Sequence, residues 1–176
     1  HYLADVIRGV KSRLRSDVNN AEYTANSTSG FDSFDSDGFT LEEDSSSLGL
    51  NESSHNMVAW CWKESATSGF DIVGYTGTGS AKTEAHSLSA VPHLMIVKSR
   101  DGAYSWAVYH HKNTSAPEDD VLFLDQNVAT DSSPVQWNDT APTSSVFSLG
   151  TGNAVNRNTD AYIAYLWSEK QGFSKF

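Results

Sequence analysis

The sequence of 176 residues is poor in cysteine, in basic residues and in long apolar runs. Its single cysteine, Cys61, excludes an internal disulfide and is predicted to be a small buried apolar residue between two Trp residues. The 12 Lys and Arg residues stand against 22 Asp and Glu residues, which gives a net charge of −10. This balance argues against nucleic acid as a partner, because phosphate binding needs clustered Lys and Arg. No window approaches the roughly 18 apolar residues that span a bilayer, so we expect no membrane insertion.

Catalytic and cofactor motifs are also missing. The sequence contains no Gly-x-Ser-x-Gly, His-Glu-x-x-His or Cys-x-x-Cys pattern. The glycine-rich run at 74–79 lacks the Lys of a phosphate loop and is predicted to be a turn. Adjacent His110 and His111 point to opposite faces of a strand and are not expected to share a metal ion. We therefore expect no enzymatic activity and no cofactor. The short basic run from Arg8 to Arg15 is expected on a solvated strand or turn face, with a local anion contact as the alternative.

Three closely spaced carboxylates, Asp32, Asp35 and Asp37, precede Gly38 and resemble half of a calcium loop. The full pattern is absent, because Ser33 stands where a further Asp would be wanted and no Glu follows at the proper spacing. The favoured interpretation is a turn in which Asp side chains cap backbone amides, with a weak calcium site as the alternative.

The apolar segments are short and rich in aromatic and β-branched residues. They lie at 70–75, 94–97, 106–109, 121–124, 146–149 and 161–167. Clusters of Gly, Ser, Asn and Asp separate them, which is typical of an all-β protein. We predict an antiparallel β-sandwich of the jelly-roll or lectin-like kind.

Part of the chain occurs twice, at offsets of 105 to 108 positions. The matched pairs are Leu14 with Leu122, Asp17 with Asp125, Phe39 with Phe147, and Asn51 with Asn156. Such self-similarity marks a tandem architecture. The match predicts that 1–64 and about 103–169 have superposable topologies. Residues 1–68 are expected to be the C-terminal part of a first unit, so that the chain begins inside a unit, and 69–176 a complete second unit.

The segment 57–62 is apolar on both alternating faces, as is its counterpart 162–167. Val58, Trp60 and Trp62 would face one way, and Met57 and Cys61 the other. A strand of this kind is covered on both faces. We therefore predict that Trp62 and its counterpart Trp167 are largely buried.

Long motifs of the second unit resemble a known domain. They are FDIVGYTGTG at 70–79, PHLMIVKSRD at 92–101, WAVYH at 106–110, APTSSVFSLG at 141–150, YIAY at 162–165 and GFSKF at 172–176. Together they resemble a domain of uncharacterised function that recurs in tandem in tail fibre and other structural proteins of tailed phages, many of them marine or cyanobacterial. DVIRGV at 5–10 and SFDSDGFTL at 33–41 look like the preceding unit. The resemblance implies a virion or other extracellular fibre component and supplies no catalytic residues.

Two functions are favoured jointly. One is an adhesion or receptor-binding module that contacts cell-surface glycan, with Trp106, Tyr109 and Trp137 as candidate glycan or subunit contacts. The other is a structural repeat that stacks into a fibre. A polysaccharide depolymerase is a less favoured third. A homo-oligomer or tandem fibre is expected, trimeric if it follows the usual tail fibre plan, because multiplied weak sites gain avidity.

Overall fold

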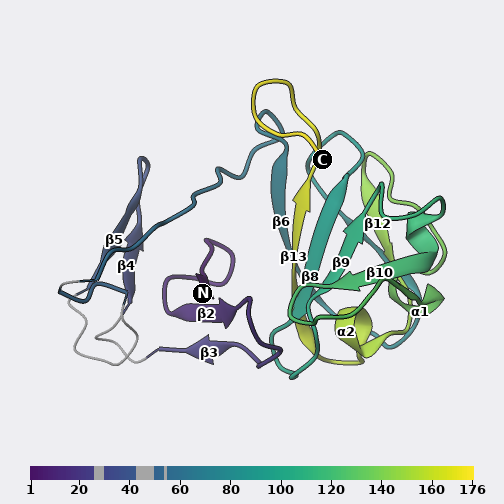
Figure 1. Cartoon of the computed structure of the whole chain (residues 1–176), viewed down its shortest axis with the longest axis horizontal. Coiled ribbons are helices and arrows are strands. Elements are labelled where there is room, and N and C mark those ends of the chain that lie inside the picture. The colour runs from purple at the N-terminus through teal and green to yellow at the C-terminus, as the bar shows by residue number, and fades with distance from the viewer. Residues whose placement is uncertain (26–29, 43–49, 54) are drawn as a thin grey trace.

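The structure, a computed structural model, describes residues 1–25, 30–42, 50–53 and 55–176. Strands account for 34% of the described residues and helices for 7%. The strands form several antiparallel sheets, and the predicted all-β, sandwich-like fold is confirmed (Figure 1).

A six-stranded antiparallel sheet forms the centre of the larger part of the molecule (Figure 1). In spatial order its strands are β11 (Asp131–Ser132), β10 (Asp120–Phe123), β9 (Ala107–His110), β8 (Leu94–Ser99), β13 (Ala161–Trp167) and β6 (Phe70–Thr76). Strand β13 is paired along its whole length with β6 and over six residues with β8. It therefore lies inside the sheet, although it follows all the other strands in the sequence.

A second layer covers one face of this sheet. It consists of β7 (Lys82–Ala85) paired with β12 (Val146–Leu149), together with η1 (Pro117–Asp119), α1 (Pro134–Trp137) and α2 (Asn153–Asn156). The buried side chains between the layers include Tyr75, Phe147, Leu149, Tyr162, Ala164 and Leu166. The side chains of β13 that point to this face are the ones that its alternating pattern predicts.

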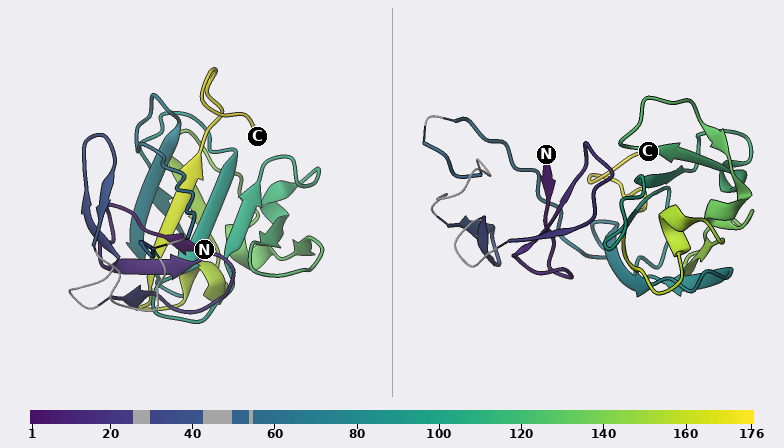
Figure 2. Two further views of the ribbon diagram at one scale, coloured as in Figure 1. Left: turned by 60° about the vertical axis from the view of Figure 1, so that its left-hand side comes forward. Right: turned by 90° about the horizontal axis from the view of Figure 1, so that it is seen from below.

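A short N-terminal sheet covers the opposite face. We call it the N-terminal meander; its strands are β1 (Tyr2–Leu3), β2 (Ser12–Arg15) and β3 (Tyr23–Thr24). Leu14 and Leu3 pack into a cluster with Phe70, Ile163 and Tyr165 of the central sheet. Figure 2 shows the meander lying in front of that sheet. Strand β13 is thus covered on both faces, as predicted.

The N-terminal meander repeats the order β9–β10–β11 of the second unit. The pair Leu3↔Leu14 corresponds to Val108↔Leu122, and Ser12↔Thr24 corresponds to Asp120↔Ser132. A polar contact repeats as well. The Trp106 amide donates to Asp125 Oδ1 over 2.8 Å, and the amino group of His1 lies 3.9 Å from Asp17 Oδ1. The predicted common topology is confirmed for these three strands.

The rest of the first unit departs from the second. Strand β5 (Phe39–Leu41) aligns with β12 but pairs with β4 (Phe31–Phe34), whereas β12 pairs with β7. The stretch 55–63, which aligns with β13, forms no strand. The prediction of superposable topologies is therefore wrong beyond the meander, and its parts at 26–29, 43–49 and 54 lie outside the described residues.

Candidate functional site

The segment 57–62, here called the exposed segment, presents apolar side chains to solvent. Val58 and Trp60 are 81% and 79% exposed, and Trp62 is 57% exposed. Cys61 is also exposed. The predictions that Trp62 and Cys61 are buried are wrong. The alternating pattern specifies two apolar faces, but burial requires flanking strands, and none of the described strands pairs with this segment.

One end of the exposed segment touches the second unit. The Trp62 ring lies 6.3 Å from the Trp167 ring in an edge-to-face arrangement and 6.4 Å from the Phe70 ring, measured between centroids. Trp62 and Trp167 are counterparts at the offset of 105. Contact between equivalent residues is the property of a two-fold interface. Trp62 is thus the point at which the exposed segment reaches the central sheet, beside Trp167 of β13 and Phe70 of β6.

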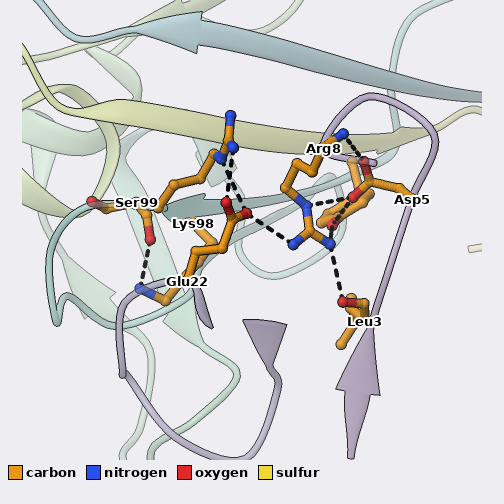
Figure 3. A network of polar contacts seen from close by, with 8 residues as sticks. Leu3, Asp5, Arg8, Glu22, Lys98 and Ser99 are labelled. Carbon is orange, nitrogen blue, oxygen red and sulfur yellow. Dashed lines mark hydrogen bonds and ion pairs between the residues drawn. The ribbon is translucent and has the colours of Figure 1, made fainter. Parts of the chain in front are cut away.

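A buried network of charges fixes the N-terminal meander to the sheet (Figure 3). Arg8 Nε donates to Asp5 Oδ2 over 2.6 Å, and Arg8 Nη1 donates to Glu22 Oε2 over 3.0 Å. Arg8 Nη2 donates to the carbonyl of Leu3 over 3.0 Å and to the Tyr165 hydroxyl over 3.1 Å. The prediction that the basic run is solvated is wrong for Arg8. Two of its partners, Glu22 and Tyr165, come from distant parts of the sequence.

The environment shifts the pKa values of Arg8, Glu22 and Tyr165 in this network. Burial alone would lower the pKa of Arg8, but Tyr165, Asp5 and Glu22 together raise it. Burial alone would raise the pKa of Glu22, but hydrogen bonds from Arg100 and Arg8 lower it. Burial raises the pKa of the Tyr165 hydroxyl, which donates to Asp5 Oδ2 over 2.7 Å. The network therefore holds the N-terminal meander against the central sheet at neutral pH.

The three aromatic residues predicted as contacts, Trp106, Tyr109 and Trp137, are all buried. Trp106 Nε1 donates to the carbonyl of Arg15 over 3.0 Å, and Trp137 Nε1 donates to the carbonyl of Asp120 over 3.0 Å. Their rings are not exposed, contrary to expectation. A buried indole N–H needs an acceptor, and backbone carbonyls of neighbouring strands supply one here.

The carboxylates considered for calcium lie at the β4–β5 hairpin. Asp35 accepts hydrogen bonds from Ser33 Oγ over 2.8 Å and Thr40 Oγ1 over 3.0 Å, while Asp32 and Asp37 are exposed. Asp35 thus serves a turn, with hydroxyl groups as its donors in place of the expected backbone amides. Within the ranges that the structure describes, no group of three or more His, Cys, Asp or Glu residues is placed to hold a metal ion.

A small hollow of about 230 Å³ lies on the N-terminal meander. Tyr2, Arg13, Arg15, Asn20, Ala21 and Tyr23 line it. Its volume is below the roughly 300–1,000 Å³ typical of ligand pockets. Of its polar lining residues, Arg13 is buried and lies beside the Tyr23 ring, whereas Arg15 and Asn20 are exposed. No motif in the sequence points to this hollow, because its residues come from three short strands and the β2–β3 loop.

The model of one protein family, described as a domain of unknown function (DUF7483), matches residues 1–176. No curated protein and no solved structure matches the chain. Among the described residues, no helix is both long enough and apolar enough to cross a membrane.

Proposed function

We propose that this chain, which belongs to the DUF7483 family of domains of unknown function, is a non-enzymatic repeat module that acts by assembling with further units. The observation that carries the proposal is the exposed segment. Val58 and Trp60 are exposed, although their counterparts Ile163 and Tyr165 are buried in the core. A contiguous exposed apolar patch marks an interaction site rather than a stable free surface.

The assembly that we propose is a virion fibre, such as a tail fibre, or another extracellular filament. The resemblance of the long motifs to tandem domains of phage structural proteins supports this setting. Repetition within the chain supports it as well, because a module that already occurs in part twice is suited to a linear array. A trimer of such chains is the arrangement expected under the usual tail fibre plan.

Sedimentation velocity of the purified chain over a range of concentrations tests the proposal. We expect concentration-dependent association that Trp60→Ser weakens by about tenfold or more, because aromatic anchors dominate interface energies. The matched control is Val128→Ser, since Val128 is 57% exposed but lies beside β11, at the opposite edge of the sheet from β6. A chain that stays monomeric at every concentration, or equal effects of both substitutions, would contradict the proposal.

Host-surface adhesion is a second candidate function, and the hollow on the N-terminal meander is the observation that favours it. Tyr23 is exposed beside Arg13, whose guanidinium lies 5.9 Å from the centre of the Tyr23 ring. A glycan array with the intact chain, Tyr23→Ala and the control Phe173→Ala tests this function. Binding that only Tyr23→Ala removes is expected, and equal binding by all three proteins would exclude the hollow.

The proposed absence of catalysis has its own test. Purified protein is incubated with host polysaccharide while polymer length and reducing ends are followed. We expect no change in either. Steady shortening of the polymer that one carboxylate substitution abolishes would make the chain a depolymerase and overturn the non-enzymatic part of the proposal.

A further inference from the structure

Two edges in the first unit lack neighbours that their counterparts have. Strand β1 pairs with β2 alone among the described strands, whereas its counterpart β9 pairs with both β10 and β8. The exposed segment pairs with none of them, whereas its counterpart β13 lies between β8 and β6. The strands that would fill both gaps come from the same stretch of sequence. That stretch is the β6–β7–β8 block, residues 69–102.

The side chains of the exposed segment require cover on both faces. Its residues Val58, Trp60 and Trp62 correspond to Ile163, Tyr165 and Trp167, which pack toward the N-terminal meander. The other three, Met57, Ala59 and Cys61, correspond to Tyr162, Ala164 and Leu166, which are buried under β7 and β12. A strand with two apolar faces belongs inside a sheet, not at its edge.

We propose that the β6–β7–β8 block of another repeat unit inserts between β1 and the exposed segment. The completed sheet has the order β3–β2–β1–β8–(57–62)–β6, in which β6 and β8 belong to the added block. This inference rests on the tandem-array part of the proposed function and names the partner of the exposed segment. The partner is a copy of the β6–β7–β8 block that has no β13 of its own between its strands, because β6 and β8 of the present chain already pair with β13.

The pairing register supports that choice of partner. In the second unit Ala164 pairs with Val97 of β8 and with Val73 of β6. The counterpart of Ala164 is Ala59, so the same small residue would pair with the added strands. A one-residue slip would place each side chain on the wrong face, so agreement of the alternation fixes the register.

The geometry at His1 shows how the added block would be joined. His1 corresponds to Trp106 at the offset of 105. The nitrogen atoms of both residues lie beside equivalent carboxylates, those of Asp17 and Asp125. For the test, a second copy of residues 69–105 is fused directly before His1, which keeps the alignment of His1 with Trp106.

Labelling of the single cysteine tests the proposal in this fused chain. Cys61 is exposed in the present structure, and its counterpart Leu166 is fully buried. We expect the rate of Cys61 modification by a maleimide reagent to fall at least ~100-fold in the fused chain, because labelling then requires local opening of the sheet. Amide hydrogen exchange across 57–62 should slow in parallel.

The matched control is the same fusion with Val97→Pro in the added copy only. Proline removes a ladder hydrogen bond in the middle of β8 and is incompatible with an inner strand. Cys61 in this control should label at the rate of the unfused chain. Slow exchange across β13 in the same samples shows that the second unit is folded in each protein.

Two results would overturn the inference: Cys61 labelling as fast in the fused chain as in the unfused one, or slowed equally in the proline control. The second would mean that any added chain shields the segment. Neither result depends on sedimentation or glycan binding of the intact chain. Failure here is thus distinguishable from failure of the proposed function.

Discussion

Replacement of Arg8 by methionine should release the N-terminal meander from the sheet at a substantial cost in stability. The Arg8 side chain is fully buried and bonds to Asp5 and Glu22, whose side chains are at most 8% exposed. Breaking a buried ion pair costs about 3–5 kcal/mol, because the remaining charge is left without a partner. Glu22 keeps two bonds from Arg100, at 2.8 and 3.1 Å, and Asp5 keeps the Tyr165 hydroxyl. We therefore expect the lower end, about 3 kcal/mol.

Urea denaturation at neutral pH measures this loss. The control is Arg15→Met, because the Arg15–Asp17 pair at 2.8 Å is largely exposed and should contribute little. Both substitutions remove one positive charge from the same meander. Equal losses of unfolding free energy for the two variants would refute the idea that a buried clamp holds the units together.

The same pair of variants should differ in acid. The pKa of Glu22 is lowered from its ordinary value of 4.5, so the stability that this carboxylate contributes is present above that value and is lost as the pH falls through the lower folded-state pKa. In Arg8→Met one of the groups that lowers this pKa is gone. The midpoint of acid unfolding should move to a higher pH by more in Arg8→Met than in Arg15→Met, because Arg15 lowers only the pKa of the exposed Asp17.

Three further outcomes are expected. Burial lowers the pKa of Lys98 from 10.5 to about 8. Between pH 8 and 10 the unfolded chain therefore binds more protons than the folded chain, and the free energy of unfolding should rise by up to ~1.4 kcal/mol per pH unit. Urea titrations of Lys98→Met should lack this rise. Gly77→Ala should destabilise by several times more than Gly38→Ala in thermal unfolding, because a Cβ at 77 would lie 2.0 Å from the Arg157 carbonyl oxygen and one at 38 meets nothing within 4 Å. Trp137→Ala should cost about 3–5 kcal/mol by calorimetry, and Trp60→Ala within about 0.5 kcal/mol, because only the first ring fills the core.

Sequence alternation predicted the second unit well and the exposed segment badly. Both faces of β13 are covered, as its pattern indicates, because β6 and β8 flank it and two layers lie above and below. The segment 57–62 has the same pattern without those neighbours. Periodicity reports which residues can share a face, whereas burial depends on strands elsewhere in the sequence.

Polar and aromatic positions were harder to predict because their partners are distant. Arg8 lies in a basic run that was predicted to be solvated, yet it donates a hydrogen bond to Tyr165, 157 positions away in the sequence. Trp106 and Trp137 were expected to be exposed, yet both are core residues whose indole N–H groups find backbone carbonyls. The repeat was the most informative signal, since it predicted a common topology and β1, β2 and β3 pair in the register that β9, β10 and β11 show.

The position of β13 between β6 and β8 has a consequence for synthesis on the ribosome. At about 5–20 residues per second, roughly 3–14 s separate the appearance of Ser99, the last residue of β8, from that of Trp167. During this interval the nascent chain holds an open gap between β6 and β8, and the segment 57–62 just ahead of β6 carries the alternating pattern that fits it. The older copy of the strand can therefore pair there before the later one exists. We expect its displacement by the later strand to be a slow step of folding, and one that the duplication itself creates.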